Sequence, residues 1–132
     1  MRIVFDDGVC EEVEVEPAGE YVRLLMTPLA SNTHARLGDL VELQNEEGDV
    51  ARFLRIVEPS TLVTLERIVG GETALSESFL ALLAEVRAMG GECERAFGGI
   101  FLLHVPPPGV TAVEKRLQML AERPTPRPLP DS

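Results

Sequence analysis

The sequence predicts an α+β fold, in which a strand-rich N-terminal lobe packs on a ferredoxin-like, split βαβ sheet with two helices. Three observations lead to this class. Short apolar runs separated by turn residues fill the first part of the chain, a pattern typical of antiparallel strands. Residues 77–89 instead repeat apolar side chains at three- and four-residue steps, which indicates a helix with one buried face. The segments after residue 60 follow the order strand, helix, strand, strand, helix, which is most of a split βαβ unit without its final strand.

A chain of 132 residues can bury roughly two-thirds of its unfolded surface, so we expect a single domain over residues 1–123. Its strand-rich lobe spans residues 1–58 and its second lobe residues 59–123. Residues 124–132 contain four prolines and are expected to form a flexible tail. The strand at 100–105 is apolar on both faces, so we expect helices on one face of its sheet and the N-terminal strands on the other.

Alternation and turn residues place the strands of the first lobe. In residues 10–16, Val13 and Val15 face one way and the glutamates between them face the other, as in a half-buried strand. Residues 17–19 (Pro-Ala-Gly) are expected to turn the chain. Residues 27–38 form the longest stretch without periodicity, a loop of the kind that often carries function. We expect strands of this lobe over residues 2–5, 10–16, 21–26, 40–43 and 50–57. A further strand over residues 61–69 is expected to begin the second lobe.

Capping residues mark the helices of the second lobe. Ser76 is expected to be the N-cap of the helix over 77–89, and Gly90 to end it in the left-handed conformation. Thr111 and Glu114 have the spacing of a capping box, so a second helix is expected to begin there and to stop before the prolines of the tail.

The hairpin between these helices brings two reactive side chains together. If Gly98-Gly99 forms a two-residue turn, counting back from it pairs Cys93 with His104 across the two strands. An imidazole beside a thiol stabilises the thiolate, so this pair is a candidate nucleophile and base. The alternative is structural, with the cysteine acting as a small apolar residue and the histidine binding a main-chain carbonyl.

Neither a metal nor a cofactor is expected. Structural zinc ligands come as close pairs, whereas the cysteines and histidines of this chain are widely spaced, at Cys10, His34, Cys93 and His104. The three glycine pairs lie where strands or a helix should end, outside any phosphate-binding motif.

The charge excludes some partners and favours others. Twenty-two acidic residues against twelve basic ones give a formal net charge of −10. Such a surface repels phosphate backbones, so nucleic-acid binding is not expected. No apolar run approaches the ~20 residues of a membrane span, and two cysteines without a secretion signal predict a cytoplasmic protein with reduced thiols.

Much of the acidic excess lies within residues 1–20, which carry seven acidic residues against Arg2 alone. We interpret Glu12, Glu14 and Glu16, on the outer face of the alternating strand, as acids that steer a basic partner protein towards this lobe. The alternative is a solvated strand face that keeps the protein soluble.

Two later segments carry a family resemblance. The run Arg36-Leu37-Gly38-Asp39-Leu40-Val41-Glu42, followed by Phe53-Leu54-Arg55-Ile56-Val57-Glu58, resembles an uncharacterised family of small bacterial domains of unknown function. The helix ending in Gly90-Gly91-Glu92-Cys93-Glu94 and the apolar strand ending in Val105-Pro106-Pro107 fit the same order. The resemblance implies the topology given above and a cytosolic bacterial setting, and it brings no catalytic residues with it.

Three functions are compatible with these observations. The first is a non-enzymatic protein-interaction module with a basic protein partner, for example an immunity or antitoxin protein, and a homodimer through a sheet edge is a further option. The second is a small-ligand-binding regulatory domain of ferredoxin-like type. Its expected contacts surround the 27–38 loop: Tyr21, His34, Arg36, Asp39 and Arg55. The third is an enzyme that uses Cys93 and His104.

Overall fold

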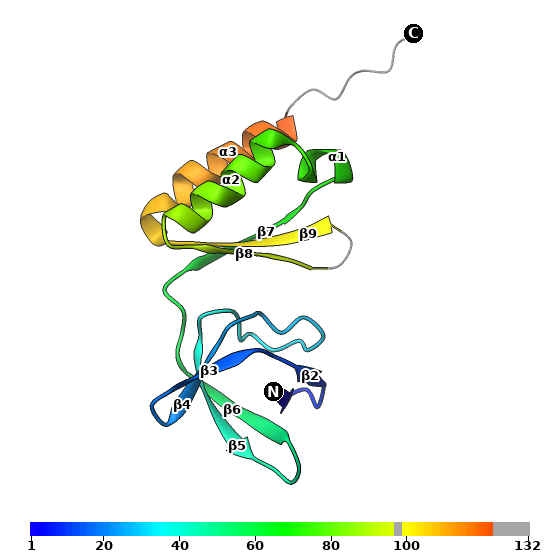
Figure 1. Cartoon of the computed structure of the whole chain (residues 1–132), viewed down its shortest axis with the longest axis vertical. Coiled ribbons are helices and arrows are strands. Elements are labelled where there is room, and N and C mark those ends of the chain that lie inside the picture. The colour runs from blue at the N-terminus through cyan, green and yellow to red at the C-terminus, as the bar shows by residue number, and fades with distance from the viewer. Residues whose placement is uncertain (97–98, 123–132) are drawn as a thin grey trace. The chain divides into compact units, whose positions relative to one another are not determined.

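A computed structural model describes residues 1–96 and 99–122 of the chain and divides the chain into two compact units (Figure 1). The first unit is Met1–Leu62 and the second is Val63–Ser132. Strands in two sheets together with two longer helices confirm the α+β class. The boundary between the units, after Leu62, lies four residues beyond the predicted lobe boundary after residue 58. That the two lobes form a single domain stays a prediction. The predicted tail, 124–132, lies outside the described residues.

The first unit consists of six strands and their connections. Their sequence order is β1 (Arg2–Val4), β2 (Cys10–Glu12), β3 (Val15–Ala18), β4 (Tyr21–Leu24), β5 (Leu40–Asn45) and β6 (Val50–Glu58). In the sheet they follow the order β2-β1-β6-β5-β4-β3, and all neighbours are antiparallel except β1 and β6.

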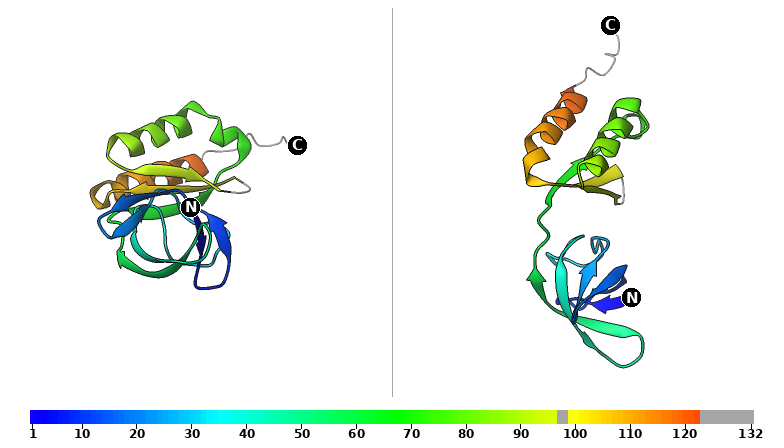
Figure 2. Two further views of the ribbon diagram at one scale, coloured as in Figure 1. Left: turned by 60° about the horizontal axis from the view of Figure 1, so that its bottom comes forward. Right: turned by 60° about the vertical axis from the view of Figure 1, so that its left-hand side comes forward.

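The two ends of this sheet are successive parts of one bent strand. Only Val13 and Glu14 separate β2 from β3. The amide of Val13 donates to the carbonyl of Met1 at 2.8 Å, and the amide of Leu25 donates to the carbonyl of Glu14 at 2.8 Å. The bent strand therefore pairs with β1 through its first half and with β4 through its second, which closes the sheet into a small barrel (Figure 2).

The core of the barrel contains the apolar residues that alternation predicts. Val13 is fully buried, Val15 packs against the core, and Glu12, Glu14 and Glu16 are exposed. The buried cluster consists of Ile3, Phe5, Val13, Leu24, Ala35 and Val41.

The predicted turn at residues 17–19 is wrong, because β3 continues through Pro17 and Ala18. Ala18 lies opposite Tyr21, so the turn consists of residues 19 and 20, and Gly19 has a φ of +68°. Such a two-residue turn makes Ala18–Tyr21 a hydrogen-bonded pair, and the nitrogen of Pro17 then points away from β4. Proline is tolerated at this position because it has no donor to lose from the ladder.

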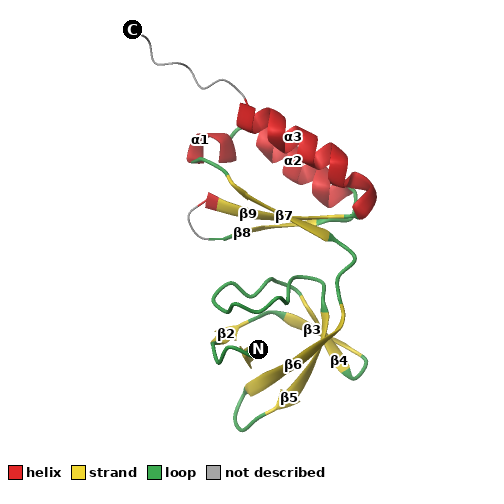
Figure 3. Cartoon of the chain, turned by 180° about the vertical axis from the view of Figure 1, so that it is seen from behind, coloured by secondary structure: helices red, strands yellow, loops and turns green. Residues whose placement is uncertain are grey.

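The second unit has a three-stranded antiparallel sheet with its two longer helices on one face (Figure 3). Its elements are β7 (Val63–Ile68), α1 (Gly71–Ala74), α2 (Glu77–Ala88), β8 (Glu92–Arg95), β9 (Ile100–Val105), η2 (Pro107–Gly109) and α3 (Val110–Glu122). The sheet order β7-β9-β8 places β9 between the strands that α2 connects. The ferredoxin-like assignment goes further than this order and stays a prediction.

The helix face of this sheet carries the core of the second unit. Phe79 of α2 meets Phe101 of β9 edge to face, with ring centroids 4.9 Å apart. The buried cluster consists of Leu65, Ala74, Phe79, Leu82, Leu83, Val86, Phe101, Leu103, Val105, Val113 and Leu117. Within the described ranges, no helix has the length and apolar character needed to cross a bilayer.

The predicted ends of α2 are confirmed, whereas the predicted start of α3 is wrong. The hydroxyl of Ser76 accepts from the amide of Phe79 at 3.2 Å. Gly90 has a φ of +96°, and the amide of Gly91 donates to the carbonyl of Val86 at 2.8 Å, which completes a Schellman end. Helix α3 follows η2 directly, so Thr111 lies inside its first turn and is not a cap. The single turn of α1 was not predicted.

We expect the substitution Ser76→Ala to lower the free energy of unfolding by about 1 kcal/mol, because the amide of Phe79 loses its acceptor. The matched control is Ser78→Ala, two residues later on the exposed side of α2. It removes the same hydroxyl from an exposed position in the first turn of the helix and should leave stability unchanged or slightly raised. Urea denaturation followed by circular dichroism measures both, and equal losses would contradict the capping role.

Candidate functional site

The long loop between β4 and β5 is held in place by carboxylates from the turn and strand that follow β1. Glu11, in β2, accepts four main-chain hydrogen bonds. Its Oε1 accepts from the amides of Leu29 at 3.0 Å and Ala30 at 3.2 Å. Its Oε2 accepts from the amides of Ala30 at 3.1 Å and Ser31 at 2.9 Å. One side chain therefore fixes three consecutive residues of the loop.

Asp7 holds the next residues of the same loop. Its Oδ1 accepts from the Ser31 hydroxyl at 2.9 Å and from the amide of Val9 at 3.1 Å, and its Oδ2 accepts from the amide of Asn32 at 2.8 Å. The hydrogen bond from Asn32 is the largest cause of a lowered pKa for Asp7. Asp7 and Glu11 thus have structural roles, although both belong to the acidic excess of residues 1–20.

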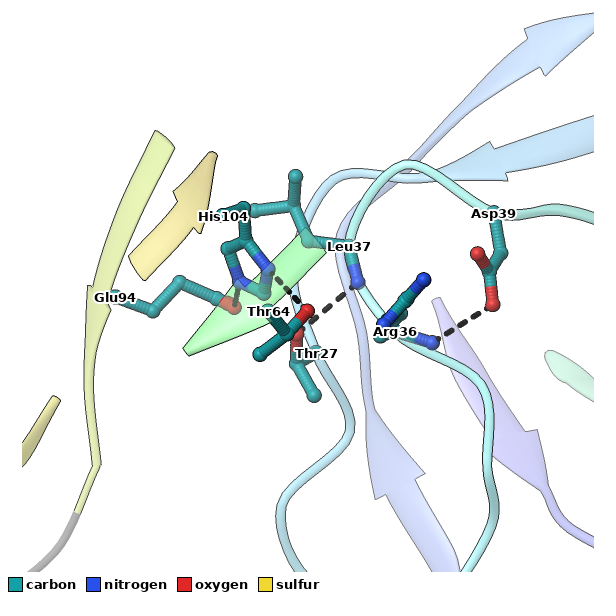
Figure 4. Close-up of polar contacts among 7 residues, drawn as sticks. All are labelled: Thr27, Arg36, Leu37, Asp39, Thr64, Glu94 and His104. Atoms are coloured by element: carbon teal, nitrogen blue, oxygen red, sulfur yellow. Dashed lines mark hydrogen bonds and ion pairs between the residues drawn. The ribbon is translucent and has the colours of Figure 1, made fainter. Parts of the chain in front are cut away.

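The other end of the loop is organised by Asp39 and Thr27 (Figure 4). Asp39 is 1% exposed, and its Oδ2 accepts from the amide of Arg36 at 3.0 Å. Its Oδ1 accepts from the amide of Ser60 at 2.7 Å. The hydroxyl of Thr27 accepts from the amide of Leu37 at 3.0 Å. Arg36 and Asp39 are therefore joined through a main-chain nitrogen.

Gly38 explains the short Leu-Gly-Asp stretch that carries the family resemblance. Its φ is +92°, and a Cβ at this position would lie 2.6 Å from the hydroxyl of Ser60. Its carbonyl also accepts from the guanidinium of Arg23 at 2.8 Å. The stretch is thus constrained by the backbone turn that it makes.

The predicted ligand contacts come from β4, from the loop between β4 and β5, and from β6. Tyr21 is half-buried at the start of β4, His34 is exposed in the loop, and Arg36 is half-buried. Arg55 is exposed on β6, where its Nε donates to Glu42 at 2.7 Å. Asp39 is enclosed and already accepts two amides, while a ligand role for the other residues stays a prediction. A depression that the sequence did not indicate lies at the β5–β6 turn, lined by Asn45, Glu46, Glu47 and Val50.

Negative charge is concentrated in the first unit. Residues 1–62 contain thirteen acidic and five basic side chains, against nine and seven in residues 63–132. Among the predicted steering acids, Glu14 and Glu16 are exposed. Glu12 is also exposed, and it binds the N-terminal ammonium at 2.7 Å, which is the first cause of its lowered pKa.

The predicted pairing of Cys93 with His104 is wrong by one residue. The strand register places Cys93 opposite Leu103 and Glu92 opposite His104. The amide of Ala96 donates to the carbonyl of Ile100 at 2.7 Å, so the connection has three residues where two were predicted. Because side chains alternate along a strand, this single residue sends Cys93 and His104 to opposite faces of the sheet. The two side chains cannot act as a nucleophile and its base.

Cys93 has the environment of a structural cysteine. It faces the helices, is half-buried, and its thiol lies 3.9 Å from the carbonyl of Leu83. Burial raises the pKa of Cys93, which disfavours the thiolate that nucleophilic chemistry requires.

His104 is bound on both sides by neighbouring strands (Figure 4). It is fully buried. Its Nδ1 lies 2.9 Å from the hydroxyl of Thr64 in β7, and its Nε2 lies 2.7 Å from Oε1 of Glu94 in β8. A hydroxyl, an imidazole and a carboxylate in a row also occur in hydrolases, where main-chain or side-chain donors for an oxyanion complete the site. Here the row satisfies both nitrogens of a buried ring, as packing requires.

Over residues 1–96 and 99–122, no three histidine, cysteine, aspartate or glutamate side chains gather closely enough to hold a metal ion.

Comparison with known proteins gives information about the fold and none about the function. No family model and no curated protein matches the sequence. Among solved structures, the chain is similar to a hypothetical protein from Neisseria gonorrhoeae, with a TM-score of 0.56 and 13% sequence identity. The likeness covers 92% of this chain and 86% of the other. A neighbour described only as hypothetical agrees with the resemblance to domains of unknown function.

We expect Asp7 to stabilise the first unit in a pH-dependent way. Its pKa is lower in the folded chain than its ordinary value, so its contribution is present above the unfolded pKa and is lost as the pH falls through the folded pKa. The difference in free energy of unfolding between the wild type and Asp7→Asn should therefore shrink as the pH falls below about 4. Urea titrations at several pH values measure it. Asp6→Asn, in the same turn, is the charge-matched control and should stay close to the wild type.

We expect the two thiols to differ in reactivity. Cys10 is exposed, whereas burial raises the pKa of Cys93, so a disulfide reagent should modify Cys10 first at neutral pH. The single variants Cys10→Ser and Cys93→Ser show which thiol gives the fast and which the slow phase of the modification reaction. In urea, where the chain is unfolded, both thiols should react at similar rates. A Cys93 that reacts as fast as Cys10 in the folded protein would contradict its structural role.

Proposed function

We propose that the chain is a non-enzymatic protein-interaction module, and that the acidic barrel of its first unit binds a basic protein partner. The observation that carries the proposal is the separation of charge, with thirteen acidic and five basic side chains in the first unit and near balance in the second. A concentrated field of one sign speeds the encounter with a partner of opposite charge. An immunity or antitoxin protein for a basic toxin is one form of this function.

The acids available to a partner differ from those that build the barrel. Asp7 and Glu11 hold the loop, and Glu12 binds the N-terminus. Glu14, at the bend before β3, Glu16, in β3, and Glu20, in the β3–β4 turn, are exposed. A partner can therefore contact these three carboxylates without breaking a hydrogen bond that supports the fold.

The proposal also fits the chemistry of the second unit. The nucleophile–base pair of the alternative enzyme that uses Cys93 and His104 is separated by the sheet, and burial raises the pKa of Cys93. The depression at the β5–β6 turn contains none of the contacts expected for the small-ligand alternative, so it adds nothing to that alternative.

Neutralising the outward acids tests the proposal. We expect the triple variant Glu14→Gln, Glu16→Gln, Glu20→Gln to bind basic proteins from the native cell extract roughly 3- to 100-fold more weakly. The wild-type interaction should weaken as salt is raised. A carbodiimide, which joins carboxylates to lysines, should link the partner to peptides that contain these glutamates.

The matched control carries three exposed neutralisations in the second unit, namely Glu72→Gln, Glu77→Gln and Glu92→Gln. Its net charge equals that of the first triple variant, so it should bind like the wild type only if the position of the charge matters. Equal binding by the two triple variants, or cross-links confined to the second unit, would overturn the proposal.

A further inference from the structure

We infer that the chain forms a symmetric dimer by antiparallel pairing of β7 with the β7 strand of a second copy. The surface is the outer edge of β7 in the second unit, and the partner is an identical chain. This inference goes beyond the proposed function and does not depend on it.

The choice of edges follows from the topology. The sheet of the first unit closes on itself through the bent strand, whereas the three-stranded sheet of the second unit is open and ends in β7 and β8. The amide of Val69 donates to the carbonyl of Gly99 at 2.9 Å. Because bonding alternates along an antiparallel ladder, the main-chain groups of Glu66 and Ile68 then point away from β9. Such an edge pairs readily with another strand.

Self-pairing of β8 is opposed by like charges in every symmetric register. A two-fold axis through Cys93 places Glu92 opposite the second copy's Glu94. Axes through Glu92, Glu94 or Arg95 place each of these side chains opposite its own copy. Like charges directly opposite one another destabilise a strand pair, so β8 is protected against dimerisation.

Self-pairing of β7 has one long register without this conflict. A two-fold axis through Glu66 or Arg67 places that charged side chain opposite the same side chain of the second copy. An axis through Thr64 leaves most of β7 beyond the paired region, so few strand residues are paired. An axis through Leu65 pairs Leu65 with its copy, Thr64 with the second copy's Glu66, and Val63 with the second copy's Arg67. In this register Val63 and Arg67 form a pair without mutual hydrogen bonds, in which side chains approach most closely.

The surroundings of β7 suit a second copy. Ile68 is 79% exposed and Val63 is 37% exposed, so apolar surface is available beside the edge. The guanidinium of Arg67 lies at the outer edge, where it donates to the carbonyl of Glu66 at 2.8 Å and lies 3.6 Å from the carboxylate of Glu114. On pairing, the amide of the second copy's Thr64 replaces the guanidinium on that carbonyl. The second unit is also close to neutral, with nine acidic and seven basic residues. Two copies therefore meet where their mutual repulsion is least.

Opposite charges placed at residue 63 test both the interface and its register. In the Leu65-centred register, Val63→Glu creates two attractive pairs with Arg67 and should tighten the dimer roughly 2- to 30-fold, whereas Val63→Arg should loosen it by a similar factor. Net charge alone predicts the reverse order, because Val63→Glu makes an acidic chain more acidic. Sedimentation equilibrium of the full chain over a concentration series measures the association constant.

Two further measurements complete the test. The double variant Val63→Arg, Arg67→Glu restores the attraction and should dimerise more tightly than Val63→Arg alone. Raised salt should strengthen the wild-type dimer by screening the net charge of −10, whereas it should weaken binding to a basic partner. Circular dichroism confirms that each variant folds, as the exposure of Val63 leads us to expect. A wild-type chain that stays monomeric at all concentrations, or Val63 variants that follow net charge, would overturn the inference.

Discussion

The bend between β2 and β3 allows one strand to serve two neighbours, and the organisation of the first unit depends on it. Val13 is fully buried at the bend and its amide bonds to Met1, while Glu14 next to it bonds to Leu25 on the other side. A flat sheet of six short strands would have two open edges and a poorly enclosed core. Closure instead surrounds Ile3, Phe5 and the other core residues with strands on all sides. The loop and the acidic outer face are both attached to this closed scaffold.

The carboxylates of the first unit divide into two kinds that look the same in the sequence. Asp7, Glu11 and Asp39 accept main-chain amides and hold a long loop that has no ladder of its own. Glu14, at the bend, and Glu16, in β3, are exposed to solvent. A buried or loop-bound amide needs an acceptor, so the first kind replaces the hydrogen bonds that a strand would have provided. The second kind contributes to the negative electrostatic potential of the surface.

Several local signals predicted local structure correctly, whereas the turn at residues 17–19, the start of α3 and the register of Cys93 were predicted wrongly. Ser76 caps α2 as its position suggests, and Val13 and Val15 face the core as alternation requires. The pairing of Cys93 failed because one residue in a turn reverses the face of every side chain beyond it. The contacts of Glu11 with Ala30 and of Thr64 with His104 span 19 and 40 residues. Residue spacing in the sequence does not predict such partners, because they depend on how the strands assemble into sheets.

The hydroxyl of Thr64 differs from the carboxylate of Glu94, which contacts the other nitrogen of His104, because a hydroxyl can either donate or accept in a hydrogen bond. A neutral ring that donates from Nε2 to Glu94 leaves Nδ1 as an acceptor, and the hydroxyl then donates to it. A carboxylate at one end of the row and a rotatable hydroxyl at the other thus give both ring nitrogens a partner within the closed interior, without a water or a second charged side chain.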